Sequence, residues 1–173
     1  MATILGISNV HSARENRGEV SMSPNRSGEA ENIKFINLGI VANEAGEVLM
    51  IRRVRLEQSK EGAVLNWAFP GGKQRSGEGR EACVEREILI ETGYAVESLR
   101  QISMRVHPQF TVLIVYHLCR LKQSQPIAEP QEEDEVAEVR WVPAEEMRGL
   151  ITTDLDPKVA KEIDVFIRRR GKK

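Results

Sequence analysis

The stretch FPGGKQRSGEGREACVEREILIETGY, from Phe69 to Tyr94, carries five glutamates between two glycine-containing turns. No proline interrupts residues 77–92, and the apolar residues Val84 and Ile88 lie one helical turn apart. This spacing predicts a helix over 77–92 that ends at Gly93, because glycine commonly stops a helix in the left-handed conformation.

Two acidic residues of this predicted helix, Glu87 and Glu91, are four positions apart and therefore project from the same face. Carboxylates at this spacing repel each other unless a positive charge lies between them. The alternative is a solvated face on which arginines, Arg80 and Arg86 among them, pair with the acids. The turn at 70–72 favours a ligand site, since glycine backbone can approach a ligand closely. A loop and helix of this kind suits a divalent cation such as Mg²⁺, which takes oxygen ligands from carboxylates and substrate phosphates.

The whole chain indicates the class of protein. With 173 residues, of which 40% are hydrophobic and 29% charged, it is typical of one globular domain with a substantial core. The net charge of −1 gives no general case for binding nucleic acid or a membrane. The longest apolar run, FTVLIVYHLC, is too short to span a bilayer, and the N-terminus lacks the pattern of a signal peptide. We expect a cytoplasmic protein whose Cys83 and Cys119 are reduced and mostly buried.

Composition separates an N-terminal arm from a domain. Residues 1–31 are rich in polar residues without a sustained period, which predicts a flexible arm, and translation starting at Met1 or at Met22 is left open. Residues 32–170 form the predicted domain. Its apolar, β-branched runs predict strands, with a first hairpin around NEAGE at 43–47 and a last helix over 157–169. This order predicts an α/β or α+β fold in which helices pack on a mixed sheet.

The spacing of the opening stretch resembles the signature of the Nudix hydrolase family. Gly72 is followed after five residues by Glu78, after seven more by Arg86-Glu87-Ile88, and then by Glu91-Thr92-Gly93-Tyr94. The resemblance extends over about 33–167, where WAFPGGK is similar to the strand that enters the motif and EVRWVPAEEM to the strand and turn near the end. It implies a mixed β-sheet sandwiched between α-helices.

The resemblance also implies a site, with Glu87, Glu91, Arg86 and Glu78 acting in catalysis and Gly71 and Gly72 in substrate binding. Glu87 and Glu91 would hold the metal, Mg²⁺ or Mn²⁺, and Arg86 would orient a neighbouring carboxylate by a charged hydrogen bond. Glu78 would be an outer acid that helps through water or as a supporting ligand. The two glycines would shape the loop so that backbone can approach the phosphates.

The departure from the family pattern is Ile90, where that pattern has a glutamate directly before the one matching Glu91. In relatives the acids matching Glu87, Ile90 and Glu91 together help to hold the metals, and an isoleucine cannot ligate. Because Mg²⁺ readily retains several waters, the loss predicts weaker metal binding rather than none. The alternative is a site that has drifted into a binding-only role.

Many relatives also recruit a glutamate from a later loop, as a base or as a further ligand. The stretch EPQEEDEVAEVRW contains the candidates Glu132, Glu133, Asp134 and Glu135. We favour Glu133 and Glu135 as metal ligands. The alternative for this cluster is a solvated acidic loop.

The implied reaction is hydrolysis of the pyrophosphate bond of a nucleoside diphosphate linked to another group, with water attacking a phosphorus that the metal polarises. The leading substrate is a nucleoside triphosphate, oxidised ones included, because the chain lacks the long extra N-terminal domain of some relatives that cleave ADP-ribose. ADP-ribose or another dinucleotide is the alternative substrate, and a nucleotide-binding sensor is the alternative function. The expected partner is a nucleotide, with no nucleic acid and no membrane, and a homodimer is left open.

Overall fold

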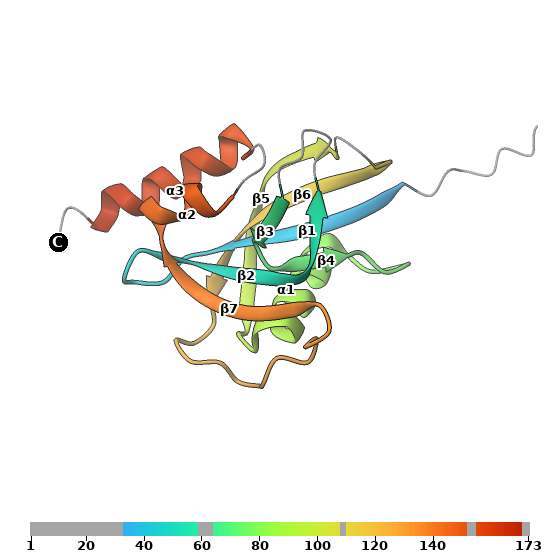
Figure 1. The fold of residues 1–173 in the computed structure, drawn as a ribbon, viewed down its shortest axis with the longest axis horizontal. Helices are drawn as coiled ribbons and strands as arrows, with labels where there is room; N and C mark the ends of the chain where they lie inside the picture. The colour runs from blue at the N-terminus through green and yellow to red at the C-terminus, as the bar shows by residue number, and fades with distance from the viewer. Residues whose placement is uncertain (1–32, 59–63, 108–109, 152–154, 171–173) are drawn as a thin grey trace, which may run out of the picture. The chain divides into compact units, whose positions relative to one another are not determined.

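The computed structural model describes residues 33–58, 64–107, 110–151 and 155–170, so the predicted arm at 1–31 lies outside the described residues. The elements of the described part follow one another as Figure 1 shows: β1 Lys34–Val41, β2 Glu47–Gln58, β3 Val64–Ala68, β4 Gly71–Lys73, α1 Arg80–Thr92, β5 Val96–Val106, β6 Val112–Leu121, β7 Val136–Pro143, α2 Ala144–Leu150 and α3 Pro157–Arg170. This mixture of strands and helices confirms the predicted α+β class.

The strands form two sheets. β4, β1, β6 and β5 lie side by side in a four-stranded sheet, and β3, β2 and β7 form a three-stranded one. β1 and β6 run parallel, from the pair Lys34 and Val112 to the pair Val41 and Cys119. The other neighbouring strands are antiparallel. The predicted mixed sheet is therefore the four-stranded one.

The predicted hairpin around 43–47 forms its turn but not its ladder. The main-chain N–H of Asn43 donates to the carbonyl of Glu47 at 3.0 Å, and the N–H of Glu47 donates to Asn43 Oδ1 at 3.0 Å. Beyond this turn one bridge joins Ala42 to Val48. β1 then pairs with β4 and β6, whereas β2 pairs with β3 and β7. The hairpin prediction is wrong because the backbone groups of the two strands find their partners in different sheets.

Helix α1 agrees with the predicted helix except at its start. It begins at Arg80 rather than at residue 77, because Gly77 has a φ of +75° and Gly79 is extended, with φ −72° and ψ 154°. The predicted end is confirmed, since Gly93 follows the helix in the left-handed conformation and its N–H donates to the carbonyl of Leu89.

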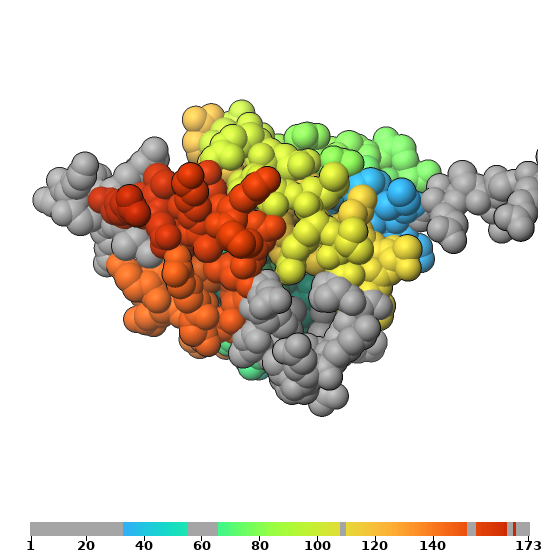
Figure 2. Space-filling view, turned by 90° about the horizontal axis from the view of Figure 1, so that it is seen from above, coloured from blue at the N-terminus to red at the C-terminus, as the bar shows by residue number. Residues whose placement is uncertain are grey.

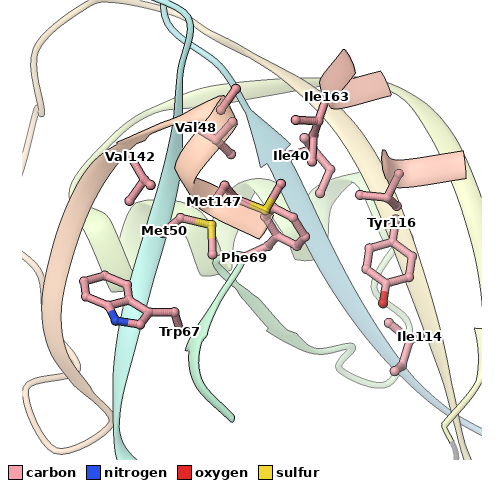
Figure 3. Packing of buried hydrophobic residues seen from close by; sticks show 12 residues of the cluster. Ile40, Val48, Met50, Trp67, Phe69, Ile114, Tyr116, Val142, Met147 and Ile163 are labelled. Atoms are coloured by element: carbon pink, nitrogen blue, oxygen red, sulfur yellow. The ribbon is translucent and has the colours of Figure 1, made fainter. Parts of the chain in front are cut away.

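The hydrophobic core has two main parts, one on each face of the sheets. Neighbouring residues of a strand point to opposite faces, so Ile40 and Val41 belong to different parts. On one face α1 packs Val84 and Ile88 against Val41 and Leu49, and all four are fully buried. On the other face α2 and α3 contribute Met147, Val159 and Ile163 to a cluster with Ile40, Val48 and Met50 (Figure 3). The sheets are thus sandwiched between helices, as the resemblance implies.

The C-terminal part contains a helix that the sequence analysis missed. The pattern of EVRWVPAEEM predicts a strand and a turn, but α2 begins directly after Pro143 and buries Ala144. Helix α3 begins at Pro157, as predicted, and Asp156 accepts a main-chain N–H of its first turn at 2.8 Å. Figure 2 shows α3, in red, beside β5, in yellow-green. These two elements are joined where Arg100 donates to Glu162 at 2.6 Å.

A loop that follows β6 packs on the C-terminal end of α1. The N–H of Ile127 donates to the carbonyl of Gly93 at 2.8 Å, and the N–H of Gln131 donates to the carbonyl of Ile90 at 2.8 Å. The loop passes so close that a Cβ on Gly93 would lie 2.0 Å from the carbonyl oxygen of Ala128. These contacts bring the acidic loop to the end of the helix that carries the predicted metal ligands.

We expect Gly93→Ala to destabilise the domain more than Gly77→Ala. The two glycines have φ values of +74° and +75°, so alanine costs about 1–2 kcal/mol of backbone strain at either position. At Gly77 nothing lies within 4 Å of the added Cβ, whereas at Gly93 the loop must move. Urea titrations should give a free energy of unfolding that falls by about 1–3 kcal/mol more for Gly93→Ala. Equal losses would contradict the loop contact.

Candidate metal and catalytic site

The candidate site lies where the short strand β4 meets helix α1. The main-chain N–H of Gly71 donates to Glu91 Oε2 at 2.7 Å, in a buried position. Glu87 lies one turn earlier on the same face of the helix. The structure brings together six of the residues that the sequence analysis predicts for the site: Gly71, Gly72, Glu78, Arg86, Glu87 and Glu91.

The two glycines of β4 leave space that other parts of the site fill. A Cβ on Gly72 would lie 2.6 Å from Glu87 Cδ, so the carboxylate of Glu87 rests against bare backbone. A Cβ on Gly71 would lie 2.1 Å from the carbonyl oxygen of Asn37, which belongs to the neighbouring strand β1. The sequence analysis missed Asn37, although a polar residue within the apolar run IKFINLGIVAN was a usable signal. That these glycines also admit phosphates stays a prediction.

Arg86 links two acids of the site. Its Nε and Nη2 donate to the two carboxylate oxygens of Glu78 at 2.7 and 3.0 Å, and its Nη1 donates to Glu87 Oε1 at 2.7 Å. The bond from Arg86 holds the pKa of Glu78 at about 2, and the same bond raises the pKa of Arg86. The fork geometry of an arginine fixes direction as well as charge. The charged hydrogen bond predicted for Arg86 is therefore present, and it orients Glu87.

Glu91 is the most buried acid of the site, with 5% of its surface exposed. Burial raises the pKa of its carboxyl to about 8, because removal from water disfavours the charged form. The N–H of Gly71 and the positive charge of Arg53 lower this pKa, and the negative charges of Glu87 and Glu132 raise it further. Glu91 thus carries a proton near neutral pH unless a cation joins the site.

The acidic loop contributes Glu132 to the electrostatics of the site. The side chain of Glu132 is partly buried, and burial and the negative charge of Glu87 raise its pKa. Glu133 and Glu135, which the sequence analysis favours as ligands, have exposed side chains. Sequence alone could not separate these acids, because the contact that sets their position joins the main chain of Gln131 to the helix.

Residues 36–168 match the family model of the NUDIX domain. The chain belongs to the NUDIX family. Among the described residues, no helix is long and apolar enough to cross a membrane.

Known proteins similar to this NUDIX domain include a Bacillus subtilis (strain 168) protein named putative 8-oxo-dGTP diphosphatase. The two are 37% identical over 71 residues, which cover 41% of this chain and 42% of that protein. The chain spans less than half the length of the curated relatives that it matches.

A MutT protein from Methanosarcina mazei Go1 has a similar structure, with a TM-score of 0.54 and 25% identity, covering 80% of this chain and 95% of that one. A NUDIX hydrolase from Nitrosomonas europaea shares the fold, with a TM-score of 0.62 and 20% identity, covering 78% and 72% of the two chains.

Ile90 occupies the position at which this NUDIX domain departs from the family signature. Its side chain is partly buried, and its carbonyl accepts the N–H of Gln131 at 2.8 Å. The core face of α1 is formed by Val84 and Ile88 instead, so the helix is not rotated to place Ile90 at the centre of the core. Position 90 lies three residues after Glu87, on the side of the helix next to the acids.

The residues of the site fit a hard divalent cation by their chemistry. Among the described residues, no three histidine, cysteine, aspartate or glutamate side chains converge closely enough to form a ready-made metal centre. Glu87, Glu91 and Glu132 nevertheless act on one another electrostatically, and all three offer carboxylate oxygens. Mg²⁺ needs few such protein ligands because it keeps several waters. The donor set therefore suits a divalent cation, with part of the coordination left to water or substrate.

We expect Glu91→Gln to stabilise the metal-free domain by an amount that grows with pH. A folded-state pKa near 8 lies above the unfolded value of 4.5, so both states are protonated below pH 4.5. As the pH rises from 4.5 to 8, only the unfolded chain releases the proton, and the stability of the wild type falls. Glutamine keeps an oxygen that accepts the N–H of Gly71, and because it does not titrate, the variant does not lose stability in this way as the pH rises.

Chemical unfolding in the presence of a chelator tests this expectation. The variant should exceed the wild type by on the order of 2–4 kcal/mol at pH 8 and by much less at pH 5. Glu97→Gln, at an exposed position, serves as the control and should change stability little at either pH. A difference between Glu91→Gln and wild type that does not depend on pH would show that the carboxyl is already ionised at pH 5.

Proposed function

We propose that this NUDIX domain hydrolyses the pyrophosphate bond of a nucleoside diphosphate linked to another group. One observation carries the proposal: the carboxyls of Glu87 and Glu91 are both buried on one face of α1, where Arg86 fixes the direction of Glu87. Acids gathered in a buried place are costly unless a cation compensates them. Membership of the NUDIX family supports the reaction class.

Glu87 and Glu91 are the proposed ligands of Mg²⁺ or Mn²⁺. The electrostatics favour Glu132 as the loop acid that completes the set or serves as a base, and Glu133 and Glu135 are the alternatives from the sequence. When bound, a divalent cation polarises the phosphate and stabilises the charge that develops on the leaving group.

The other residues of the site hold these acids in place. Arg86 donates to the carboxylate of Glu87 and keeps it turned toward β4. The carboxylate of Glu78 accepts from Nε of the same arginine. Gly71 and Gly72 are the proposed place where a substrate phosphate approaches the main chain next to the acids. Removing the side chain of Arg86 or Glu78 should weaken catalysis through orientation as well as through charge.

The proposed substrate is a nucleoside triphosphate, oxidised ones included. Similarity to the Bacillus subtilis protein named putative 8-oxo-dGTP diphosphatase supports this choice. ADP-ribose or another dinucleotide is the alternative substrate. Ile90 favours one second function, a nucleotide-binding sensor with little turnover, because the family signature has a glutamate at this position and isoleucine offers no oxygen to a metal. A cytoplasmic location, a homodimer and the absence of a nucleic-acid partner stay predictions of the sequence.

We expect purified protein to cleave at least one compound in a panel of nucleoside diphosphate derivatives, measured as the nucleoside monophosphate that is formed. Activity should require Mg²⁺ or Mn²⁺ and disappear on addition of a chelator. Glu87→Gln should lower turnover by at least about 10- to 100-fold, since loss of a proposed ligand should cost no less than loss of a residue that orients one. Glu81→Gln, at an exposed position of the same helix, should leave turnover unchanged. Measurable nucleotide binding without turnover across the panel would favour the sensor.

We expect Ile90→Glu to lower the Mg²⁺ concentration that gives half-maximal activity, because it adds a carboxylate beside the proposed ligands. The same change adds negative charge, so the metal-free variant should melt at a lower temperature than wild type. Mg²⁺ should recover more stability in the variant, in line with tighter binding to the folded state. Ile90→Gln, which has the size of glutamate without its charge, is the matched control and should show neither effect of charge. Destabilisation by Ile90→Glu that Mg²⁺ does not reverse would contradict the missing-ligand account.

A further inference from the structure

A chain of buried polar side chains crosses the interface between α1 and the four-stranded sheet. Asn37 on β1 and His117 on β6 have no exposed surface. His117 Nε2 lies 3.1 Å from Asn37 Oδ1, and His117 Nδ1 lies 3.1 Å from the hydroxyl oxygen of Ser98 on β5. The surrounding interface is apolar, with Val84 and Ile88 of α1 among its members. Polar groups in such a place must be hydrogen-bonded to one another to avoid a large desolvation cost.

The other end of this chain reaches the loop between β4 and α1. Asn37 Nδ2 donates to Gln74 Oε1 at 3.4 Å, and Gln74 Nε2 donates to the carbonyl of Glu78 at 2.6 Å. The main-chain N–H of Gln74 also donates to the carbonyl of Phe35 on β1 at 3.0 Å. Glu78 is the acid that receives the fork of Arg86. The polar chain therefore runs from β5 through the sheet to the partner of Arg86.

The donor and the acceptor of each hydrogen bond in this chain of polar side chains follow from the group at its end, the carbonyl of Glu78. The carbonyl of Glu78 can only accept, so Gln74 turns its amide nitrogen toward it and its oxygen toward Asn37. Asn37 must then donate to Gln74 and present its oxygen to His117. His117 consequently donates from Nε2 and accepts at Nδ1 from the hydroxyl of Ser98. Burial lowers the pKa of His117, in agreement with a neutral ring.

We propose that His117 and Asn37 are positioning residues, which act through Gln74 to hold Glu78 where Arg86 can orient Glu87. The same Asn37 faces Gly72 in the pairing of β1 with β4, and its carbonyl excludes a side chain at Gly71. One buried residue thus sets both the loop and the glycines against which the acids lie. If the pair of Asn37 and His117 only stabilised the fold, two apolar side chains of similar shape could replace it at little cost. A positioning role therefore explains the buried hydrogen-bonded pair better.

Two variants of His117 separate the bond to Asn37 from the packing of the ring. In His117→Gln the amide nitrogen reaches the place of Nε2 and can still donate to Asn37. In His117→Asn the shorter amide reaches only the place of Nδ1, next to Ser98. Both lose the ring, so both should melt at lower temperatures than wild type. Half-saturation by Mn²⁺ should need about tenfold more ion for His117→Asn and less than about threefold more for His117→Gln, as for other residues that orient metal ligands.

Nuclear magnetic resonance supplies a readout that does not depend on metal or turnover. Nitrogen shifts of the His117 ring should identify the neutral form with the proton on Nε2. The Nε–H signal of Arg86, which reports its bond to Glu78, should move in His117→Asn and stay near its wild-type position in His117→Gln. If His117→Asn does not fold, Gln74→Met tests the same connection from a partly exposed position and should move the same signal.

The inference rests on the proposed function for its Mn²⁺ readout, and the two can fail separately. A wild-type protein without Mn²⁺ binding or turnover would overturn the proposed function, while the predicted response of the Arg86 signal would still support positioning of the Glu78–Arg86 pair. Equal responses of the Arg86 signal in His117→Asn and His117→Gln would overturn the positioning role. A wild-type Arg86 signal and wild-type Mn²⁺ affinity in Gln74→Met would overturn it as well.

Discussion

The hydrogen bond from the main chain of Gly71 to the buried carboxyl of Glu91 ties β4 to α1. β4 has three residues and pairs with β1, so this contact joins the helix to the sheet in addition to the core packing of Val84 and Ile88. Glu87, one turn earlier, then lies against Gly72, where an added side chain would displace the Glu87 carboxylate. The acids, the glycines and the strand pairing are parts of one arrangement, and none of them can move alone.

This arrangement concentrates negative charge in a place with little water. Arg86 compensates part of it by bonds to Glu78 and Glu87, and Arg53 lowers the pKa of Glu91 without bringing it to its ordinary value. The remaining excess is relieved by a proton on Glu91. We propose that a proton and a divalent cation are alternatives at this group, which would give the site a physical reason to bind metal. On this proposal, cation binding restores the stability that is lost by burying the acid.

Local spacing in the sequence predicts those parts of the site that lie on one helix. The interval between Glu87 and Glu91 places both on one face, and Gly93 ends the helix, as the structure confirms. Contacts between distant segments were not predictable in this way. The first two strands join different sheets rather than a hairpin, because their partners come from much later in the chain.

The same limit applies to the acidic loop and to the buried polar chain. Glu132 is distinguished from its acidic neighbours by main-chain bonds from Ile127 and Gln131 to the end of α1, which no local pattern reveals. His117 stands in the strongest strand pattern of the sequence, where its partner on β1 cannot be guessed. Tertiary contacts decide these positions, and the side-chain types alone allow several arrangements.

The central proposal is that Glu91 holds a proton that a divalent cation displaces, and proton release on metal binding measures this most directly. Calorimetry of Mn²⁺ binding to wild-type protein, repeated in buffers with different ionisation enthalpies, gives the number of protons released per ion. With the pKa of Glu91 at about 8, close to one proton should be released at pH 7. The number should fall between pH 7 and pH 8.5. Mn²⁺ binding without proton release at pH 7 would contradict the account.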